Sequence, residues 1–202
     1  MIRLYIFDEG GVMIRNHMIM DQVAQALGIT RERLREVFNP DIFLLQRGEI
    51  DTATFWERVG SRLGWKPQED LLATLFRPVR DEPTFQIARE LACRSRLVCG
   101  TNTIPSHHDI NVSLGMYEPF HAVYASHLMH RAKPDPAFWH FILDAEGVPP
   151  EECCFVDDDG ENVEAASRLG ISSVLYHDAA SLRAALLDAG APLLQTRNGC
   201  CT

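Results

Sequence analysis

The chain lacks the long apolar run of a membrane-spanning helix. Hydrophobic residues make up 46% of its 202 positions, but no uninterrupted stretch approaches the roughly 20 residues needed to cross a bilayer. The first residues, Met1 to Leu4, also lack the basic segment and apolar run of a signal peptide. We therefore expect no membrane partner and a cytoplasmic location.

The spacing of the cysteines fits neither a metal knuckle nor a disulfide framework. The chain has six cysteines and no Cys-x-x-Cys motif. Four of them form two adjacent pairs, Cys153-Cys154 and Cys200-Cys201. The pattern favours reduced, structural thiols, which agree with a cytoplasmic location.

An excess of positive charge is missing too. The formal net charge is −9, and no basic stripe is present that could neutralise nucleic-acid phosphates, so we expect no nucleic-acid partner. A small anionic substrate is compatible with this balance, because local groups rather than net charge set the potential of a site. The chain also has no internal repeat and no low-complexity tract.

A helical stretch follows the first predicted strand, which covers residues 2–7. Between residues 16 and 79, apolar residues recur at three- and four-residue spacing in four segments. These segments are 17–27, 30–38, 52–63 and 68–76, with glycine or proline between them. Four short helices without an intervening strand suggest a small bundle inserted into another domain.

From residue 80 onward, predicted strands and helices alternate. Strands are expected at 96–99, 122–125, 153–156 and 173–176, and helices at 83–95, 105–114, 135–146, 161–169 and 179–189. Such alternation implies right-handed crossovers and a parallel sheet with helices on both faces. The sequence therefore predicts a discontinuous α/β core, residues 1–15 and 80–202, and a helical cap, residues 16–79.

Polar residues gather at the predicted strand ends. Asp8 ends the first apolar run, and Thr101 and Asn102 follow the next strand. Lys133 precedes a helix, and a run of aspartates, 157–159, follows a later strand. Open α/β sheets bind ligands at the carboxyl ends of their strands, so we expect these residues to share a site. Carboxylates there suit Mg²⁺, and hydroxyl, amide and ammonium groups suit phosphate oxygens.

Each of these segments also has a simpler structural explanation. Asp8 can cap the following turn, and Thr101 and Asn102 can belong to a turn only. Lys133 can be a solvated side chain. The aspartates 157–159 can form a helix N-cap cluster that compensates the helix dipole. The occurrence of all four segments together, in this order, is what favours a shared site.

These motifs follow a fixed order along nearly the whole chain. They are Asp8-Glu9-Gly10-Gly11-Val12, Thr101-Asn102, Lys133-Pro134, and Asp157-Asp158 with Asn162. In this order the chain resembles the haloacid dehalogenase-like hydrolase superfamily. Residues 45–50 and the context of Val156-Asp157-Asp158 are most similar to phosphatases related to glucose-1-phosphatase and to the N-terminal domain of soluble epoxide hydrolase. The resemblance implies a Rossmann-like, doubly wound parallel sheet with an inserted helical-bundle cap.

The resemblance also implies a nucleophile and a metal site. Asp8 would be the catalytic nucleophile and would form an aspartyl-phosphate. Asp8 and Asp158 would bind Mg²⁺, and the backbone carbonyl of Gly10 would be a further ligand. These roles match the demands of phosphoryl transfer, which consist mostly of positioning and charge neutralisation.

Further residues would hold the transferring phosphoryl group. The resemblance assigns this role to Thr101, Asn102 and Lys133, the last of which is also catalytic. Asp157 would position Lys133, and Asn162 would steady the last loop.

Gly10 departs from the pattern of most phosphatases in the superfamily, which have a second aspartate at this position as general acid and base. Such a group contributes typically about 10²–10⁴-fold. One interpretation is a substrate whose leaving group needs little protonation, such as an anomeric sugar phosphate or an acyl phosphate. Another is a substitute proton carrier: His17, His107 and His108 are candidates, whereas Glu9 points the opposite way. The third is a protein that binds phosphate compounds with little turnover.

We expect a Mg²⁺-dependent phosphatase for a small phosphorylated metabolite, such as a sugar phosphate. A haloacid dehalogenase is a further alternative, because that reaction also uses an aspartate nucleophile. It needs no Mg²⁺, however, and leaves the adjacent carboxylates of Asp157 and Asp158 unexplained.

The candidates to line the substrate pocket from the helical segment and its entry are Arg15, Phe43, Arg47 and Trp56. Aromatic residues of a four-helix cap more commonly form its core. The sequence determines neither the substrate nor the oligomeric state.

Overall fold

The computed structural model of the protein describes residues 1–194. Its core is a five-stranded parallel sheet in the order β5-β4-β1-β6-β7. The strands are β1 (Leu4–Phe7), β4 (Arg96–Thr101), β5 (Ala122–Ala125), β6 (Cys153–Asp157) and β7 (Ser172–Leu175). The first strand in sequence therefore lies at the centre of the sheet, and the predicted parallel α/β core is confirmed.

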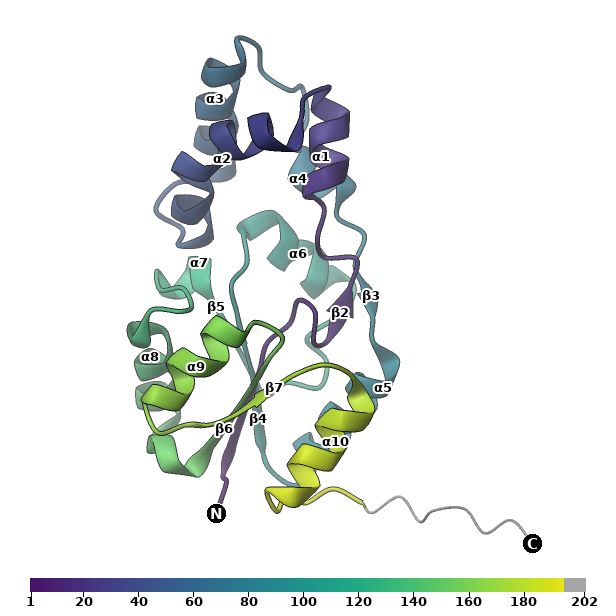
Figure 1. The fold of residues 1–202 in the computed structure, drawn as a ribbon, viewed down its shortest axis with the longest axis vertical. Helices are drawn as coiled ribbons and strands as arrows, with labels where there is room; N and C mark the ends of the chain where they lie inside the picture. The colour runs from purple at the N-terminus through teal and green to yellow at the C-terminus, as the bar shows by residue number, and fades with distance from the viewer. Residues whose placement is uncertain (195–202) are drawn as a thin grey trace, which may run out of the picture.

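Helices cover both faces of this sheet (Figure 1). They are α5 (Glu82–Ala92) and α10 (Ala179–Asp188) on one face, and α8 (Pro136–Glu146) and α9 (Gly160–Arg168) on the other. In β1, Tyr5 and Phe7 pack toward α5 and α10, whereas Leu4 and Ile6 pack toward α8 and α9. Both faces of the strand are buried, which explains its continuous apolar sequence.

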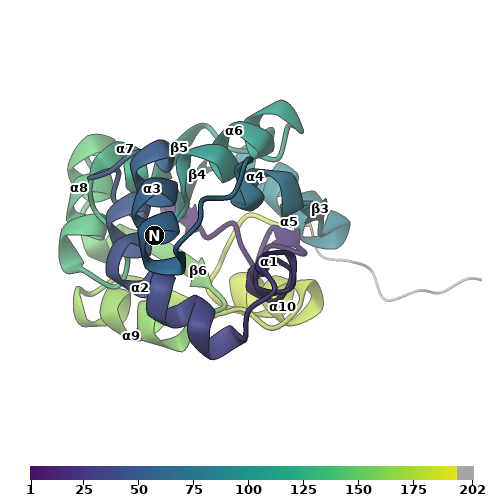
Figure 2. The same ribbon diagram turned by 90° about the horizontal axis from the view of Figure 1, so that it is seen from above.

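Four helices lie above the carboxyl edge of the sheet, and Figure 2 shows them over the sheet rather than beside it. They are α1 (Met20–Leu27), α2 (Arg31–Gln46), α3 (Thr52–Leu63) and α4 (Leu71–Leu75). The rings of Phe38, Phe55 and Trp56 pack edge to face between α2 and α3, with centroids 5.0 to 5.6 Å apart. This aromatic cluster holds α2 and α3 together, and it is continuous with the apolar cluster on the α5 and α10 face of the sheet.

Helix α2 is longer than the sequence predicts, because it continues through Pro40. The prediction ends this helix at residue 38, since Asn39-Pro40 is typical of a helix end. In the structure, the buried carboxylate of Asp41 accepts hydrogen bonds from Arg58, at 2.8 Å, and from Arg62 on α3. These contacts between α2 and α3 stabilise α2. They offset the loss of the hydrogen bond that the nitrogen of Pro40 cannot donate.

Several short elements are not apparent from the sequence. The chain enters and leaves the four helices through β2 (Ile14–Arg15) and β3 (Val79–Arg80), which pair antiparallel. Val79, the last residue of the predicted helical stretch, is thus in a strand. A four-residue helix, α7 (Ser126–Met129), follows β5, and a 3-10 turn, η1 (Pro150–Glu152), precedes β6. Elements this short carry no periodic pattern.

Helix α6 (Pro105–Ser113) follows β4 and lies between the sheet and α4. None of the helices among residues 1–194 combines the length and the apolar character needed to cross a bilayer. The cysteines at 93, 99, 153 and 154 are free thiols, as predicted. The pair Cys200-Cys201 lies outside the described residues.

Candidate active site

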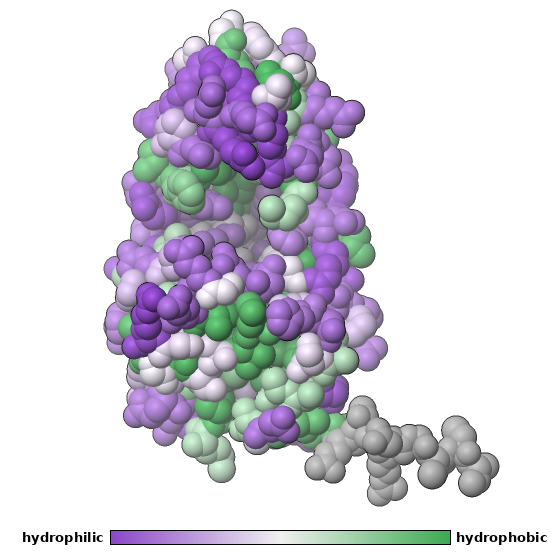
Figure 3. Space-filling view, in the orientation of Figure 1, coloured by the Kyte–Doolittle hydropathy of each residue, from purple (hydrophilic) through white to green (hydrophobic). Residues whose placement is uncertain are grey.

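A cavity of about 380 Å³ lies between the carboxyl edge of the sheet and the helices above it. The space-filling view shows the molecule hollowed at this level (Figure 3). Asp8, Thr101 and Asp157 line the cavity from the ends of β1, β4 and β6. Because parallel strands all end at the same edge, residues far apart in sequence meet here.

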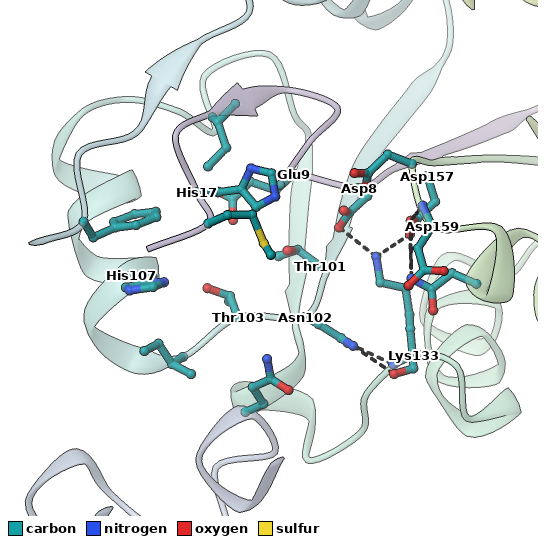
Figure 4. A pocket seen from close by; sticks show the side chains of 18 of the residues that line it. Asp8, Glu9, His17, Thr101, Asn102, Thr103, His107, Lys133, Asp157 and Asp159 are labelled. Carbon is teal, nitrogen blue, oxygen red and sulfur yellow. Dashed lines mark hydrogen bonds and ion pairs between the residues drawn. The ribbon is translucent and has the colours of Figure 1, made fainter. Parts of the chain in front are cut away.

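Lys133 lies at the centre of the polar end of this cavity (Figure 4). Its Nζ donates to Asp8 Oδ1 and to Asp157 Oδ2, both at 2.7 Å, and to the carbonyl oxygen of Gly100 at 3.0 Å. The Lys133 side chain is only 1% exposed. The alternative that Lys133 is a solvated side chain is therefore wrong, and its ammonium connects the carboxyl ends of β1, β4 and β6.

Asp157 is fully engaged in holding its neighbours. Besides the Lys133 ammonium, its carboxylate accepts from Asn162 Nδ2 at 3.2 and 3.3 Å and from the backbone N–H of Asp159 at 2.8 Å. The contacts are those expected of a residue that positions Lys133 and of an asparagine that steadies the loop.

Asn102 forms a reciprocal pair with the backbone of Lys133. Its Nδ2 donates to the Lys133 carbonyl at 2.8 Å, and its Oδ1 accepts from the Lys133 N–H at 2.9 Å. The side-chain amide is thus committed to the loop that carries the lysine, whereas the sequence leads us to expect it on the phosphoryl group. Thr101, which is buried at the end of β4, lines the cavity.

Three carboxylates converge beside the lysine. Ligand oxygens of Asp8, Asp157 and Asp158 all lie within 4.8 Å of one another. Gly11 provides the space for this approach: its φ is +79°, and a Cβ there would be 2.0 Å from Asp158 Oδ2. Hard carboxylate oxygens at this spacing suit a divalent cation such as Mg²⁺. Gly10, whose carbonyl is the further predicted ligand, lines the same cavity.

The third aspartate of the run has a different role. Asp159 is the N-cap of α9 and accepts from the N–H of Glu161 at 2.9 Å. The N-cap explanation of the aspartate run therefore holds for Asp159, which also lines the cavity, while the carboxylates of Asp157 and Asp158 are the two that converge with Asp8. This division follows from position, because only the residue directly before a helix can cap it.

Burial and mutual charge shape the ionisation of the site. Burial raises the pKa of Asp8 to about 7, Lys133 opposes that rise, and Asp157 adds to it. Burial alone would lower the pKa of Lys133, but the two carboxylates outweigh it and raise the pKa above its usual range. Burial, followed by the charge of Asp157, also raises the pKa of Asp158. The site holds more negative charge than one ammonium can balance, which favours a cation.

The candidate proton carriers lie in different surroundings. The His17 ring lies against Gly10, and burial lowers its pKa. His107 also lines the cavity, but its Nε2 bonds the Leu72 carbonyl oxygen at 3.0 Å and its ring stacks on Phe76. His108 contacts the rings of residues 117 and 127 instead.

Glu9 is a buried acid that the sequence motif does not single out. Its side chain is directed to α6, where Oε1 accepts from Asn111 Nδ2 at 2.8 Å. Burial raises the pKa of Glu9 to about 8, so the carboxyl group is largely neutral at pH 7. This agrees with the expectation that Asp8 and Glu9, as neighbours on an extended segment, point in opposite directions.

The residues suggested by the sequence as pocket lining lie elsewhere. Arg15 pairs with Asp81 at 2.8 Å, and Arg47 pairs with Glu49 at 2.6 Å. Phe43 is 60% exposed, and Trp56 belongs to the aromatic core of the helices. The cavity is lined instead by Met20, Ile42, Leu72 and Phe76. Their helical spacing marks a buried face but does not tell a core from a cavity wall.

The sequence profile of one known family covers most of the chain. It describes haloacid dehalogenase-like hydrolases and matches residues 2–170. The chain belongs to the haloacid dehalogenase-like hydrolase family. Among curated proteins, it is 28% identical to the sesquiterpene phosphatase astK of Aspergillus oryzae, over 82% of this chain and 85% of that protein.

Solved structures of this family share its fold. A predicted HAD-like hydrolase from Porphyromonas gingivalis superposes with a TM-score of 0.80 at 24% identity, over 94% of this chain and 98% of that one. A HAD family enzyme from Bacteroides thetaiotaomicron superposes with a TM-score of 0.71 at 22% identity, over 88% of this chain and 96% of that one. The latter was crystallised with magnesium and inorganic phosphate.

Proposed function

We propose that this hydrolase is a Mg²⁺-dependent phosphatase that cleaves a small phosphate monoester through phosphorylation of Asp8. The central observation is the contact of Lys133 Nζ with both Asp8 and Asp157 at 2.7 Å, beside the converging carboxylate of Asp158. The phosphatase named among its relatives, and the magnesium and phosphate bound to its structural neighbour, support this proposal.

Asp8 is suited to act as the nucleophile. Lys133 binds Oδ1, which leaves the other carboxylate oxygen for attack on phosphorus. Attack forms an Asp8 O–P bond and breaks the bond from phosphorus to the leaving oxygen, which departs with the bonding electron pair and takes its proton from water. Water then attacks the phosphorus of the aspartyl-phosphate, which releases inorganic phosphate and restores the carboxylate.

The other residues hold charge and position. Asp8 and Asp158, with the Gly10 carbonyl, are the groups that would bind Mg²⁺, which when bound would neutralise phosphoryl charge. Lys133 supplies a fixed positive charge, and the hydroxyl of Thr101, which lines the cavity, would donate to a phosphoryl oxygen. Asn102, Asp157 and Asn162 act on Lys133 and the last loop rather than on the phosphoryl group.

A glycine at position 10 favours substrates with a good leaving group. The chain offers no aspartate there, so, by leaving group alone, acyl and anomeric phosphates are better suited to hydrolysis than simple alkyl phosphates. The paired carboxylates of Asp157 and Asp158 favour the phosphatase over a dehalogenase, since charge of this density calls for a cation that dehalogenation does not use.

Phosphate release from acetyl phosphate and p-nitrophenyl phosphate, with Mg²⁺ and with EDTA, tests the proposal. We expect Mg²⁺-dependent release that falls at least about 10³-fold in Asp8→Asn. The matched variant Asp109→Asn, which changes an exposed residue of α6, should keep the wild-type rate. Normal Mg²⁺-dependent hydrolysis by Asp8→Asn would overturn the assignment of the nucleophile. A wild-type protein that binds phosphate but releases none would show a binding protein instead.

A further inference from the structure

The cavity has two chemically different ends (Figure 4). The end formed by the sheet carries the carboxylates and Lys133, whereas the end formed by the helices carries apolar side chains. Met20, Ile42, Leu72 and Phe76 line it from the helical side, and Ile14 and Ile104 from the core. A ligand that fills both ends must therefore combine a phosphoryl group with an apolar part.

The apolar end offers no charge to a second anionic group. Lys133 is the one lysine or arginine lining the cavity of the described chain, and its ammonium is already bound by two carboxylates. Three arginines directly follow lining residues in sequence: Arg15 pairs with Asp81, Arg47 pairs with Glu49, and Arg77 donates to the backbone carbonyl of Phe76 at 2.8 Å. A nucleotide, a bisphosphate or a carboxylated sugar would bring an anion into this end without a partner.

The apolar end also offers few partners for hydroxyl groups. From the helical side, the hydrogen-bonding side chains that line the cavity are those of His17 and Gln46. His107, on α6, presents its ring to Phe76 in a parallel stack at 3.8 Å, and its Nε2 is occupied by the Leu72 carbonyl. A sugar ring with several hydroxyl groups would lose hydrogen bonds to water on entering, and such losses are costly.

Resting on the phosphatase activity proposed above, we infer that the substrate is the phosphate monoester or acyl phosphate of an uncharged, largely apolar compound, and Gly10 favours those members of this class whose leaving oxygen needs little protonation. Its phosphoryl group lies at Asp8 and Lys133, and its hydrocarbon part lies against Ile42, Leu72 and Phe76. The cavity volume, about 380 Å³, is within the usual range for small-molecule sites, of order 300–1,000 Å³. The lining favours this class over the sugar phosphates that the sequence suggests.

Equilibrium binding to the Asp8→Asn variant tests this inference without requiring turnover. Calorimetry with butyl, hexyl and octyl phosphate, in the presence of Mg²⁺, should show affinity rising by up to about fourfold per methylene until the cavity is filled. Glucose 1-phosphate should bind at least tenfold more weakly than hexyl phosphate. Affinity that is independent of chain length, or glucose 1-phosphate binding as tightly as hexyl phosphate, would overturn the inference.

Two neighbouring residues of α2 provide a matched pair of variants. Ile42 lines the cavity, whereas Phe43 is 60% exposed and does not. Ile42→Gln should lower the kcat/KM ratio of octyl phosphate to glucose 1-phosphate by roughly tenfold or more, and Phe43→Gln should leave it unchanged. Equal effects of both variants would place the hydrocarbon part outside this cavity. Cooperative thermal melting of both variants is the control that each is folded.

The two proposals fail in different ways. If no phosphate ester or acetyl phosphate is hydrolysed but affinity still rises with chain length, the catalytic proposal is wrong and the ligand class stands. If acetyl phosphate is hydrolysed with Mg²⁺ but affinity is flat across the alkyl series, the catalytic proposal stands and the ligand class is wrong.

Discussion

The imidazole of His17 lies directly against Gly10. A Cβ added to Gly10 would be 3.1 Å from His17 Cδ2 and 3.6 Å from its Nε2. The space into which a side chain at position 10 would extend is therefore partly occupied by an aromatic ring from the start of the helical segment. An aspartate at position 10 would crowd that ring, which would have to shift by a few tenths of an ångström.

This contact predicts how an acid can be restored. Gly10→Asp alone should raise kcat for alkyl phosphates only slightly, because its carboxyl group meets the imidazole. Gly10→Asp combined with His17→Ser should raise it by roughly 10²-fold, since general acid catalysis contributes about 10²–10⁴-fold. Hydrolysis of p-nitrophenyl phosphate, whose leaving group needs little protonation, should change little in either variant.

The single variant His17→Ser is the control, because it reports what loss of the ring does by itself. If Gly10→Asp raises kcat as much as the double variant does, the ring is not the obstacle. If neither variant changes kcat for alkyl phosphates, protonation of the leaving group does not limit the rate.

The sequence predicts the sheet well because its strands carry strong local signals. β5 and α3 have the predicted bounds, Ala122–Ala125 and Thr52–Leu63. The convergence of Asp8 with Asp157 is also predictable, because parallel strands end at one edge. These features follow from apolar runs, glycine turns and the rules of strand connection, all of which are local or topological.

Other features depend on contacts between distant segments. α2 continues through Pro40 because α3 binds Asp41, and no local signal reports that contact. Likewise, Arg15 turns to Asp81 rather than into the cavity. The position of the His17 ring and the apolar lining depend on how the helices pack over the sheet, which periodicity alone does not determine.

Removal of the central ammonium should affect both activity and stability. Lys133→Ala would leave Asp8 and Asp157 buried side by side without compensation, and breaking a buried pair costs about 3–5 kcal/mol. We expect kcat to fall at least about 10²–10³-fold and the melting temperature at pH 8 to fall clearly. At pH 5 the loss of melting temperature should be smaller, because burial raises the pKa of Asp8 to about 7 and its carboxyl group can then take up a proton. An equal loss at both pH values would contradict the electrostatic cause.

Substitutions of the neighbouring residues Asp158 and Asp159 should differ in their effect on the affinity for Mg²⁺. Asp158→Asn removes one of the converging carboxylates, so we expect the dissociation constant for Mg²⁺, measured by calorimetry, to rise at least about tenfold. Asp159→Asn is the matched control, because asparagine is also a good N-cap and α9 should keep its start. If both variants weaken Mg²⁺ binding equally, general charge rather than coordination is responsible.

The buried acid Glu9 should make stability depend on pH. Burial raises its folded-state pKa from 4.5 to about 8, so folding favours the protonated form. The stability it confers is fully present below pH 4.5 and is lost as the pH rises toward 8. Glu9→Gln should thus melt at a similar temperature at pH 4.5 but roughly 4–8 °C higher at pH 9, for a gain of about 2 kcal/mol.

The exposed residue Glu161 provides the comparison for this variant. Glu161→Gln should shift the melting curve little at either pH, because its side chain is in water in both states. A Glu9→Gln protein that is less stable than the wild type at pH 9 would show that Glu9 is charged and well compensated.

The pairing of β2 with β3 has a consequence for access to the cavity. Ile14 lies opposite Arg80, so the two chain segments that connect the sheet to α1–α4 form one two-stranded ribbon. The division at residues 15/16 and 79/80 remains our prediction. Because both connecting segments belong to this ribbon, a rigid-body movement of the four helices away from the sheet would be a rotation about a single hinge axis at the ribbon. On the side away from this ribbon, Ser126 Oγ of α7 donates to the Gln46 carbonyl of α2 at 2.6 Å. This is the contact that such a rotation would break to open the cavity.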